Sequence, residues 1–209
     1  MTSVLVADDH AIFRQGVRAL LENEGFEIVG ECENGFEAVR AARELRPEVA
    51  VLDLSMPVLN GIDAACEMRS AAPATGTILL TVHAERQHVV AAIEAGVRGY
   101  VLKTQAVAEL VQAIQAVVRG DSYLSPAIST TVLDAYRTKD AEPEGPLTSR
   151  ERQLLQLVAE GKTTRQAAEL LGVSVKTAET HRTRVMKKLG IHETASLVRY
   201  AIRQGLTEL

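Results

Sequence analysis

The stretch Val49-Ala-Val-Leu-Asp53-Leu-Ser-Met-Pro57, followed closely by Asn60-Gly61, decides the fold. Its first four residues are apolar and two of them are β-branched, which predicts a strand that is buried on both faces. Pro57 and Asn60-Gly61 are turn formers, so Asp53 is expected at the end of that strand, at the mouth of a loop. An isolated aspartate in such a place commonly only accepts hydrogen bonds from nearby backbone amides. A functional role for Asp53 therefore depends on the rest of the chain.

Short apolar segments alternate with helical patterns on both sides of this stretch. Strands are predicted at residues 4–7, 26–31, 49–52, 77–81 and 100–103, and helices at residues 11–23, 35–45, 61–71, 86–95 and 107–119. Five strands alternating with five helices are typical of a doubly wound, five-stranded parallel α/β sheet. In such a sheet the functional groups gather beyond the carboxyl ends of the strands.

Five polar side chains lie at the ends of four of these strands. Asp8 and Asp9 follow the first strand, Asp53 ends the third, Thr81 ends the fourth and Lys103 ends the fifth. Three crowded carboxylates repel one another unless a hard cation lies among them, and carboxylate oxygens suit Mg²⁺. The Lys103 ammonium and the Thr81 hydroxyl would then bind an incoming anion. This arrangement predicts a phosphoryl group on Asp53, with its carboxylate as the nucleophile.

Charge is distributed unevenly along the 209 residues, although the net charge is only -4. Residues 1–120 carry 16 acidic and 10 basic side chains, a balance of -6, whereas residues 146–209 carry 6 acidic and 11 basic ones, a balance of +5. The first region therefore suits a cation site, and the second suits a polyanion.

Cysteine usage and hydropathy indicate a cytoplasmic protein. Cys32 and Cys66 are far apart and form no CxxC motif, which argues against a disulfide framework or a structural zinc site and favours buried thiols. No apolar run approaches the roughly 18 residues of a membrane span. We therefore expect no membrane partner.

Residues 121–146 are predicted to join two domains. Ser125-Pro126 suits the start of a short helix that reaches about residue 136, and residues 137–146 are charged and proline-bearing, as in a linker. The second domain, residues 147–209, opens with Thr148-x-x-Glu151, the spacing of a capping box. Its helices are predicted from this box to about residue 160 and at residues 166–171, 175–189 and 194–204.

The second and third of these later helices are joined by a short turn, Gly172-Val-Ser174, as in a helix-turn-helix. One face of the third helix is polar and opposes an apolar face. The polar face carries Lys176, Thr180, Thr183 and Lys187, flanked by Glu179 and Arg184. Such a face is most often merely solvated. Here it belongs to the second helix of a helix-turn-helix in a domain with a balance of +5, which favours DNA binding.

Residues 1–120 resemble the receiver domain of bacterial two-component response regulators. The resemblance is carried by Asp8-Asp9, the run from Asp53 to Gly61, Thr81, and Gly99-Tyr-Val-Leu-Lys103. The sequence departs from many receivers at Val82, where a smaller residue is usual, and at Thr104, where proline is usual.

The receiver resemblance implies roles for individual residues. Asp53 would be phosphorylated by a sensor histidine kinase. Mg²⁺ would be bound by Asp9, Asp53 and the backbone carbonyl of Ser55, with Asp8 helping through water. Thr81 and Tyr100 would form a switch pair, in which the hydroxyl moves onto the phosphoryl group and the aromatic ring fills the vacated space. No enzymatic activity is expected beyond autophosphorylation from phosphodonors and slow self-dephosphorylation.

Residues 147–207 resemble the LuxR-type helix-turn-helix of the NarL/FixJ class of response regulators. The matching residues include Leu147-Thr-Ser-Arg-Glu-Arg152, Val173-Ser174, Lys176-Thr177, His181 and Lys188-Leu-Gly190, whereas Thr164 and Ala167 depart from the commoner Asn and Ile. The resemblance implies that Glu179, Thr180 and Thr183 face bases, while Lys176, Arg184 and Lys187 hold phosphates. It further implies dimerisation through Leu197, Val198, Ala201 and Ile202, although part of that stripe must close a small core.

Together the two resemblances predict a transcriptional regulator that binds double-stranded promoter DNA, as a homodimer, under the control of phosphorylation. Phosphoryl transfer to Asp53 would alter domain docking and dimerisation. One alternative, an aspartate-dependent phosphatase, would need a second aspartate two residues after the nucleophile, where the chain has Ser55. Another is a phosphorelay or protein-binding regulator whose second domain does not bind DNA, which the +5 balance and the polar helix face disfavour.

The acidic residue on the polar helix face has two alternative roles. Glu179 either accepts a hydrogen bond from a cytosine amino group or forms an intrahelical pair with Arg182 or the neighbours of Arg184.

Four histidines show no ligand spacing and are expected to be surface or loop residues. They are His10, His83, His88 and His192.

Overall fold

The computed structural model describes residues 1–129 and 147–207, which form an α/β unit and a helical unit. Within these ranges no helix is both long and apolar enough to cross a membrane. The helix predicted after Ser125 does begin there, since the backbone N–H groups of Ile128 and Ser129 donate to the Ser125 carbonyl. Its predicted end and the predicted linker lie outside the described residues.

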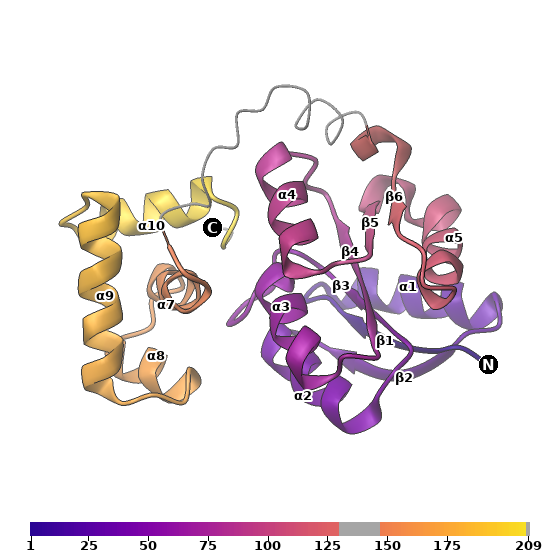
Figure 1. Ribbon diagram of the computed structural model, residues 1–209, viewed down its shortest axis with the longest axis horizontal. Helices are drawn as coiled ribbons and strands as arrows, with labels where there is room; N and C mark the ends of the chain where they lie inside the picture. Colours follow the sequence, from indigo (N-terminus) through magenta and orange to yellow (C-terminus); the bar gives the residue numbers. More distant parts are fainter. Residues whose placement is uncertain (130–146, 208–209) are drawn as a thin grey trace. The chain divides into compact units, whose positions relative to one another are not determined.

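A parallel sheet forms the centre of the α/β unit (Figure 1). Its strands are β1 (Ser3–Ala7), β2 (Glu27–Cys32), β3 (Val49–Leu52), β4 (Gly76–Thr81), β5 (Gly99–Leu102) and β6 (Tyr123–Leu124). The order across the sheet is β2-β1-β3-β4-β5-β6, and all neighbours are parallel. The chain reverses its direction of travel across the sheet between β1 and β3. A crevice at a reversal of this kind, beyond the carboxyl ends of the strands, is where doubly wound folds place their functional groups.

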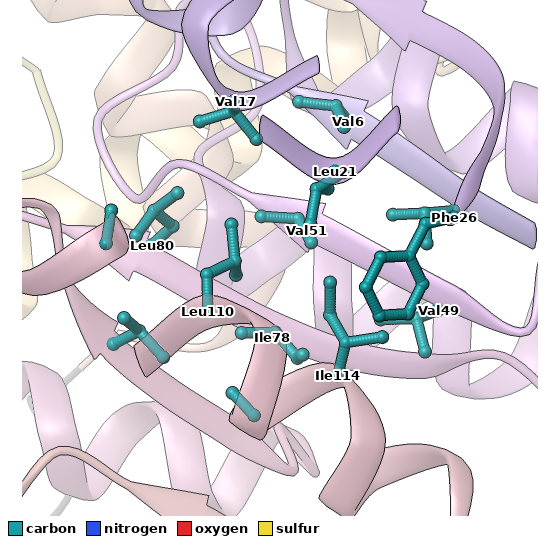
Figure 2. Close-up of a cluster of buried hydrophobic side chains, with 14 of the residues drawn as sticks. Val6, Val17, Leu21, Phe26, Val49, Val51, Ile78, Leu80, Leu110 and Ile114 are labelled. Carbon is teal, nitrogen blue, oxygen red and sulfur yellow. The ribbon is translucent and has the colours of Figure 1, made fainter. Parts of the chain in front are cut away.

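Helices cover both faces of the sheet. They are α1 (Ala11–Asn23), α2 (Gly35–Leu45), α3 (Gly61–Ala71), α4 (Arg86–Ala95) and α5 (Ala106–Val118). Helices α1 and α5 lie on one face, and α2, α3 and α4 lie on the other (Figure 1). Figure 2 shows Val17 and Leu21 of α1 and Leu110 of α5 packed around strand residues such as Val51. All four residues of β3 are buried, as expected for a strand that is covered on both sides.

The sixth strand is a difference from the five that the sequence predicts. β6 has only two residues, which is too short for a hydropathy pattern, and it pairs with Gly99 and Tyr100 of β5. Lys103 does not end β5 but opens a short 3-10 helix, η1 (Lys103–Gln105). The other predicted boundaries in this unit agree with the structure to within one residue.

The helical unit contains α7 (Ser149–Ala159), α8 (Thr164–Leu170), α9 (Val175–Leu189) and α10 (Thr194–Arg203). The predicted capping box of Thr148 and Glu151 is present, and Lys188 Nζ of α9 lies 2.6 Å from the same Glu151 carboxylate. Helix α8 begins two residues earlier than predicted, because Thr163 and Gln166 form a second capping box.

Two apolar clusters hold the helical unit together. One contains Leu154, Leu157, Val158, Ala167, Ala168 and Ala178 and joins α7, α8 and α9; the other contains Leu147, Leu155, Val185, Leu197 and Ala201 and joins α7, α9 and α10. Leu197 and Ala201 are therefore core residues, being 1% and 0% exposed. This corrects the predicted dimerisation stripe, because a side chain enclosed within its own domain has no surface left for a second copy. Val198 and Ile202 are half-buried and reach the surface.

Both cysteines are free thiols. Burial, the largest influence, raises the pKa of Cys32 to about 11, so its thiol stays protonated and unreactive at neutral pH. Cys66 is half-buried and not fully buried as predicted.

Candidate functional site

The carboxyl ends of β1 and β3 bring three aspartates together. Asp8 and Asp9 follow β1, Asp53 follows β3, and each offers a carboxylate oxygen within 4.8 Å of the other two. Asp8 and Asp53 are only 3% and 4% exposed, whereas Asp9 is exposed. The cluster therefore has two buried carboxylates and a third that solvent can reach.

The ammonium group of Lys103 lies between the two buried carboxylates. Its Nζ is 2.8 Å from Asp8 Oδ2 and 2.9 Å from Asp53 Oδ2, and it lies 4.6 Å from the centroid of the Phe13 ring. Burial by itself lowers the pKa of Lys103, but the charges and hydrogen bonds of Asp53 and Asp8 outweigh burial and raise that pKa. Lys103 is therefore an ammonium group at neutral pH.

The charge of Lys103 does not fully neutralise the carboxylates of this cluster. With Asp8, Asp53 and Lys103 ionised the sum is -1, and Asp9 makes it -2. Burial raises the pKa of Asp53, and the charge of Asp8 adds to that effect, against the opposing influence of Lys103 and the Leu54 N–H. Excess negative charge and a donor set of carboxylate oxygens fit a hard divalent cation such as Mg²⁺.

Gly61 allows the loop after β3 to pass close to this cluster. A Cβ at position 61 would lie 2.1 Å from the backbone oxygen of Asp53, so no other residue fits there. The Gly61 N–H donates to the Leu54 carbonyl, and the Asn60 side chain accepts from the Asp63 N–H at the start of α3. The Asn60-Gly61 turn thus fixes the backbone around Asp53.

Thr81 and Tyr100, the predicted switch pair, are both buried and both bonded to the backbone of His83. The His83 N–H donates to Thr81 Oγ1 at 3.2 Å, and the Tyr100 hydroxyl donates to the His83 carbonyl at 2.9 Å. The His83 ring continues toward the acidic cluster, since its Nε2 lies 3.1 Å from Ser55 Oγ. His83 therefore links both residues of the pair to the loop that follows Asp53.

The polar face of α9 is the second candidate surface. All six of its predicted DNA-contacting residues are exposed, whereas Ala178 and Val185 on the opposite face are buried. The hydroxyls of Thr180 and Thr183 donate to the carbonyls of Lys176 and Glu179, each at 2.9 Å. Each threonine is left with an acceptor oxygen and a methyl group, and threonine methyls contact thymine methyls in the major groove.

Glu179 forms no side-chain ion pair within the part of the chain that the structure describes. Arg182, one neighbour proposed for such a pair, donates instead to Thr164 Oγ1 at 3.1 Å and to Thr194 Oγ1 at 2.8 Å. Arg182 thereby joins the start of α8 and the start of α10 to α9. The intrahelical pair proposed for Glu179 is absent from this arrangement.

Comparison with known proteins gives the same division of the chain. Residues 4–115 match the family described as response regulator receiver domain, and residues 145–201 match bacterial regulatory proteins of the luxR family. The chain is 37% identical over 209 residues to the transcriptional regulatory protein LiaR of Bacillus subtilis, with 99% of each chain covered. The chain belongs to the LuxR-type response regulators.

Two further similarities support this membership. The transcriptional regulatory protein MctR of Rhizobium johnstonii is 35% identical over 204 residues, which cover 97% of this response regulator and 94% of MctR. A solved structure of RcsB from Salmonella enterica serovar Typhimurium, bound to promoter rprA with the phosphomimetic BeF3-, has a TM-score of 0.59 at 28% identity. The match covers 96% of this chain and 98% of that one.

The predicted fold class and family are thus confirmed. The α/β unit is the receiver domain and the helical unit is the LuxR-type DNA-binding domain of a two-component transcriptional regulator.

One histidine of the receiver domain differs from the sequence-based expectation, and another is at the surface as expected but lies beside the acidic cluster. His88 is 6% exposed and not a surface residue, because it shares the inward stripe of α4 with Ala92 and Ala95. His10 is exposed, but its Nδ1 lies 2.8 Å from Asp9 Oδ1 and 3.4 Å from Asp8 Oδ1. His10 directly follows Asp8-Asp9 in the sequence, and this adjacency could have predicted its position beside the acidic cluster.

Proposed function

We propose that this response regulator accepts a phosphoryl group from a sensor histidine kinase on Asp53, and that the modification alters domain docking and dimerisation to control promoter binding. The observation that carries this proposal is the position of Lys103 Nζ, 2.9 Å from Asp53 within a largely buried cluster of three aspartates. A nucleophilic carboxylate beside a fixed ammonium group and an excess of oxygen ligands suits phosphoryl transfer.

In the transfer, a carboxylate oxygen of Asp53 attacks the phosphorus atom of a phosphohistidine on the kinase. The P–N bond breaks, and the imidazole nitrogen leaves with the electron pair and takes up a proton. Lys103 then binds a phosphoryl oxygen by a charge-assisted hydrogen bond. The Thr81 hydroxyl donates a hydrogen bond to another phosphoryl oxygen. Its hydrogen is available because the His83 N–H bonds only a lone pair of Thr81 Oγ1.

Mg²⁺ would be held by Asp9, Asp53 and the backbone carbonyl of Ser55, with Asp8 helping through water. When bound, the ion neutralises the charge that develops on phosphoryl oxygens. We propose no enzymatic activity beyond autophosphorylation from small phosphodonors and slow self-dephosphorylation.

The phosphoryl group adds a charge of about -1.5 to -2 and three strong acceptor oxygens at Asp53. Movement of the Thr81 hydroxyl toward them weakens its bond from the His83 N–H. Since Tyr100 donates to the carbonyl of the same residue, the change reaches β5 and the loop that precedes α4. A segment of this kind can have two packing arrangements, which the phosphoryl group biases.

On DNA, the polar face of α9 would enter the major groove. Lys176, Arg184 and Lys187 would hold phosphates, while Glu179, Thr180 and Thr183 would face bases. Val198 and Ile202 would contribute to a homodimer. A related structure, 27% identical to this chain, is described as two RcsB dimers bound to two parallel DNAs, which supports DNA binding as a dimer.

Labelling by acetyl phosphate in the presence of Mg²⁺ tests the phosphoacceptor. Wild type should be labelled, and Asp53→Asn should not be, because the amide keeps the size of the side chain but is not a nucleophile. Asp121→Asn is the matched control, since Asp121 is exposed and remote in sequence from the cluster. Labelling that persists in Asp53→Asn, or that a chelator leaves unchanged, would contradict the assignment.

A further inference from the structure

A second group of ligand-type side chains lies at the loop between β4 and α4. His83, Glu85 and His88 place two ring nitrogens and a carboxylate oxygen within 4.8 Å of one another. We propose that these three residues bind a transition-metal ion with the ligand preference of Zn²⁺, at a site separate from the acidic cluster.

The geometry of the three side chains is close to that of a metal site. His83 Nδ1 lies 3.5 Å from Glu85 Oε2, and the rings of His83 and His88 have centroids 5.1 Å apart at an angle of 53°. In a tetrahedral zinc site with bonds of about 2.0–2.1 Å, neighbouring ligand atoms are about 3.4 Å apart. The His83–Glu85 pair already has this spacing, and the gap that remains to His88 is at most about 1.4 Å, within reach of a side-chain rotation.

The backbone explains why these residues meet although His83 lies outside the helix. Glu85 is the N-cap residue of α4, but its side chain does not cap the helix and instead lies beside His83. Its backbone carbonyl accepts from the N–H groups of His88 and Val89, which closes the first turn. That turn places His88 above Glu85, on the side of the helix that the loop approaches.

The donor set distinguishes this site from the acidic cluster. Two imidazoles and one carboxylate suit Zn²⁺ and similar transition-metal ions, whereas Mg²⁺ prefers oxygen ligands alone. The contact of His83 Nε2 with Ser55 Oγ orients the ring so that Nδ1 faces Glu85, as outer hydrogen bonds orient metal-binding histidines.

A metal ion at this site would act on the receiver switch. Coordination of the His83 ring would hold the residue whose N–H and carbonyl bond Thr81 and Tyr100. Because coupling between two binding events is reciprocal, phosphorylation of Asp53 would change the affinity for the metal, and the metal would change the response to phosphorylation. This coupling rests on the proposed function, whereas metal binding itself does not.

Calorimetric titration of the full-length, unphosphorylated protein with Zn²⁺ tests the site, with excess Mg²⁺ present to compete at the acidic cluster. We expect one Zn²⁺ per chain. Glu85→Gln removes an exposed ligand that supports no core, and His88→Gln removes the buried ligand. Each should weaken binding about tenfold or more, in line with the sensitivity of metal sites to changed ligand shells.

His192→Gln, at an exposed histidine of the DNA-binding domain, is the matched control and should leave the affinity unchanged. Circular dichroism checks that His88→Gln is folded. If His88→Gln is unfolded, the affinity of Glu85→Gln for Zn²⁺ decides the test. Unchanged binding in Glu85→Gln would overturn the proposal. Binding that Asp9→Asn abolishes and Glu85→Gln retains would also overturn it, by placing the ion at the acidic cluster.

The coupling is measured separately, as the rate of acetyl phosphate labelling with and without Zn²⁺ in wild type and Glu85→Gln. A rate that Zn²⁺ changes only in wild type supports the coupling. A rate that Zn²⁺ leaves unchanged in a protein shown to bind it would refute the coupling. Failure of labelling in every sample would count against the phosphoacceptor assignment, and the titration result would stand apart from it.

Discussion

Replacing Asp53 by asparagine should stabilise the receiver domain when Mg²⁺ is absent. In wild type the two buried carboxylates of Asp8 and Asp53 share the single ammonium group of Lys103, a sum of -1, whereas Asp53→Asn leaves Asp8 and Lys103 as a neutral pair. Because the pKa of Asp53 is raised in the folded protein, its ionised form costs stability at neutral pH. The expected gain is about 0.5–2 kcal/mol, the usual size of a single stabilising substitution.

The pH dependence has a definite sign. A raised pKa means that the stability associated with protonated Asp53 is fully present below the unfolded value of about 3.9 and is lost as the pH rises through the folded pKa. The advantage of Asp53→Asn should therefore vanish in acid and reach its full value at neutral pH.

Mg²⁺ should make wild type more stable than Asp53→Asn, the reverse of the order expected without the ion. At a concentration of about 100 times its dissociation constant, an ion that binds only the folded state adds about 2.7 kcal/mol, and Asp53→Asn should gain less because it lacks one ligand. Urea unfolding followed by circular dichroism, with the transitions of the two domains fitted separately, measures both effects. Asp121→Asn should match wild type. A variant at position 53 that is less stable than wild type without Mg²⁺, or that gains as much from the ion, would refute the reasoning.

Three predictions concern DNA. Lys176→Ala and Lys187→Ala should each weaken binding to all sequences alike and lower the salt slope by roughly one, as measured by titration at several salt concentrations; a loss confined to certain sequences would mean base contacts. Glu179→Ala should relax the preference at one base pair per half-site in a site selection, and an unchanged motif would assign Glu179 a structural role. Residues 146–209 alone should bind DNA better per half-site than the unphosphorylated chain at equal dimerisation, and no difference would exclude inhibition by the receiver domain.

The sheet and the acidic cluster could be predicted because both depend on periodic features. Apolar strands alternate with helical patterns, and parallel strands bring their carboxyl ends to one edge, so Asp8, Asp53 and Lys103 had to lie near one another. The capping box at Thr148 is a local motif and was equally accessible. Strand β6 could not be predicted, because the two residues that pair with β5 leave no pattern in the sequence.

The role of His83 could not be predicted for a different reason. It bonds Thr81 and Tyr100 through its backbone, and backbone bonds in a loop leave no mark on residue type. Its approach to His88 depends on how the loop enters α4, a matter of tertiary geometry. Likewise, the division of the α10 stripe into buried Leu197 and half-exposed Val198 depends on how α10 packs against its neighbours.

The most direct test of the central claim is the affinity of the full-length protein for a promoter fragment selected from genomic DNA, measured before and after treatment with acetyl phosphate and Mg²⁺. Wild type should bind about 5- to 150-fold more tightly after treatment, the range expected for coupling between two sites in one protein. Asp53→Asn should show no change. An equal affinity of wild type before and after treatment, or an equal gain in Asp53→Asn, would contradict control of DNA binding through Asp53.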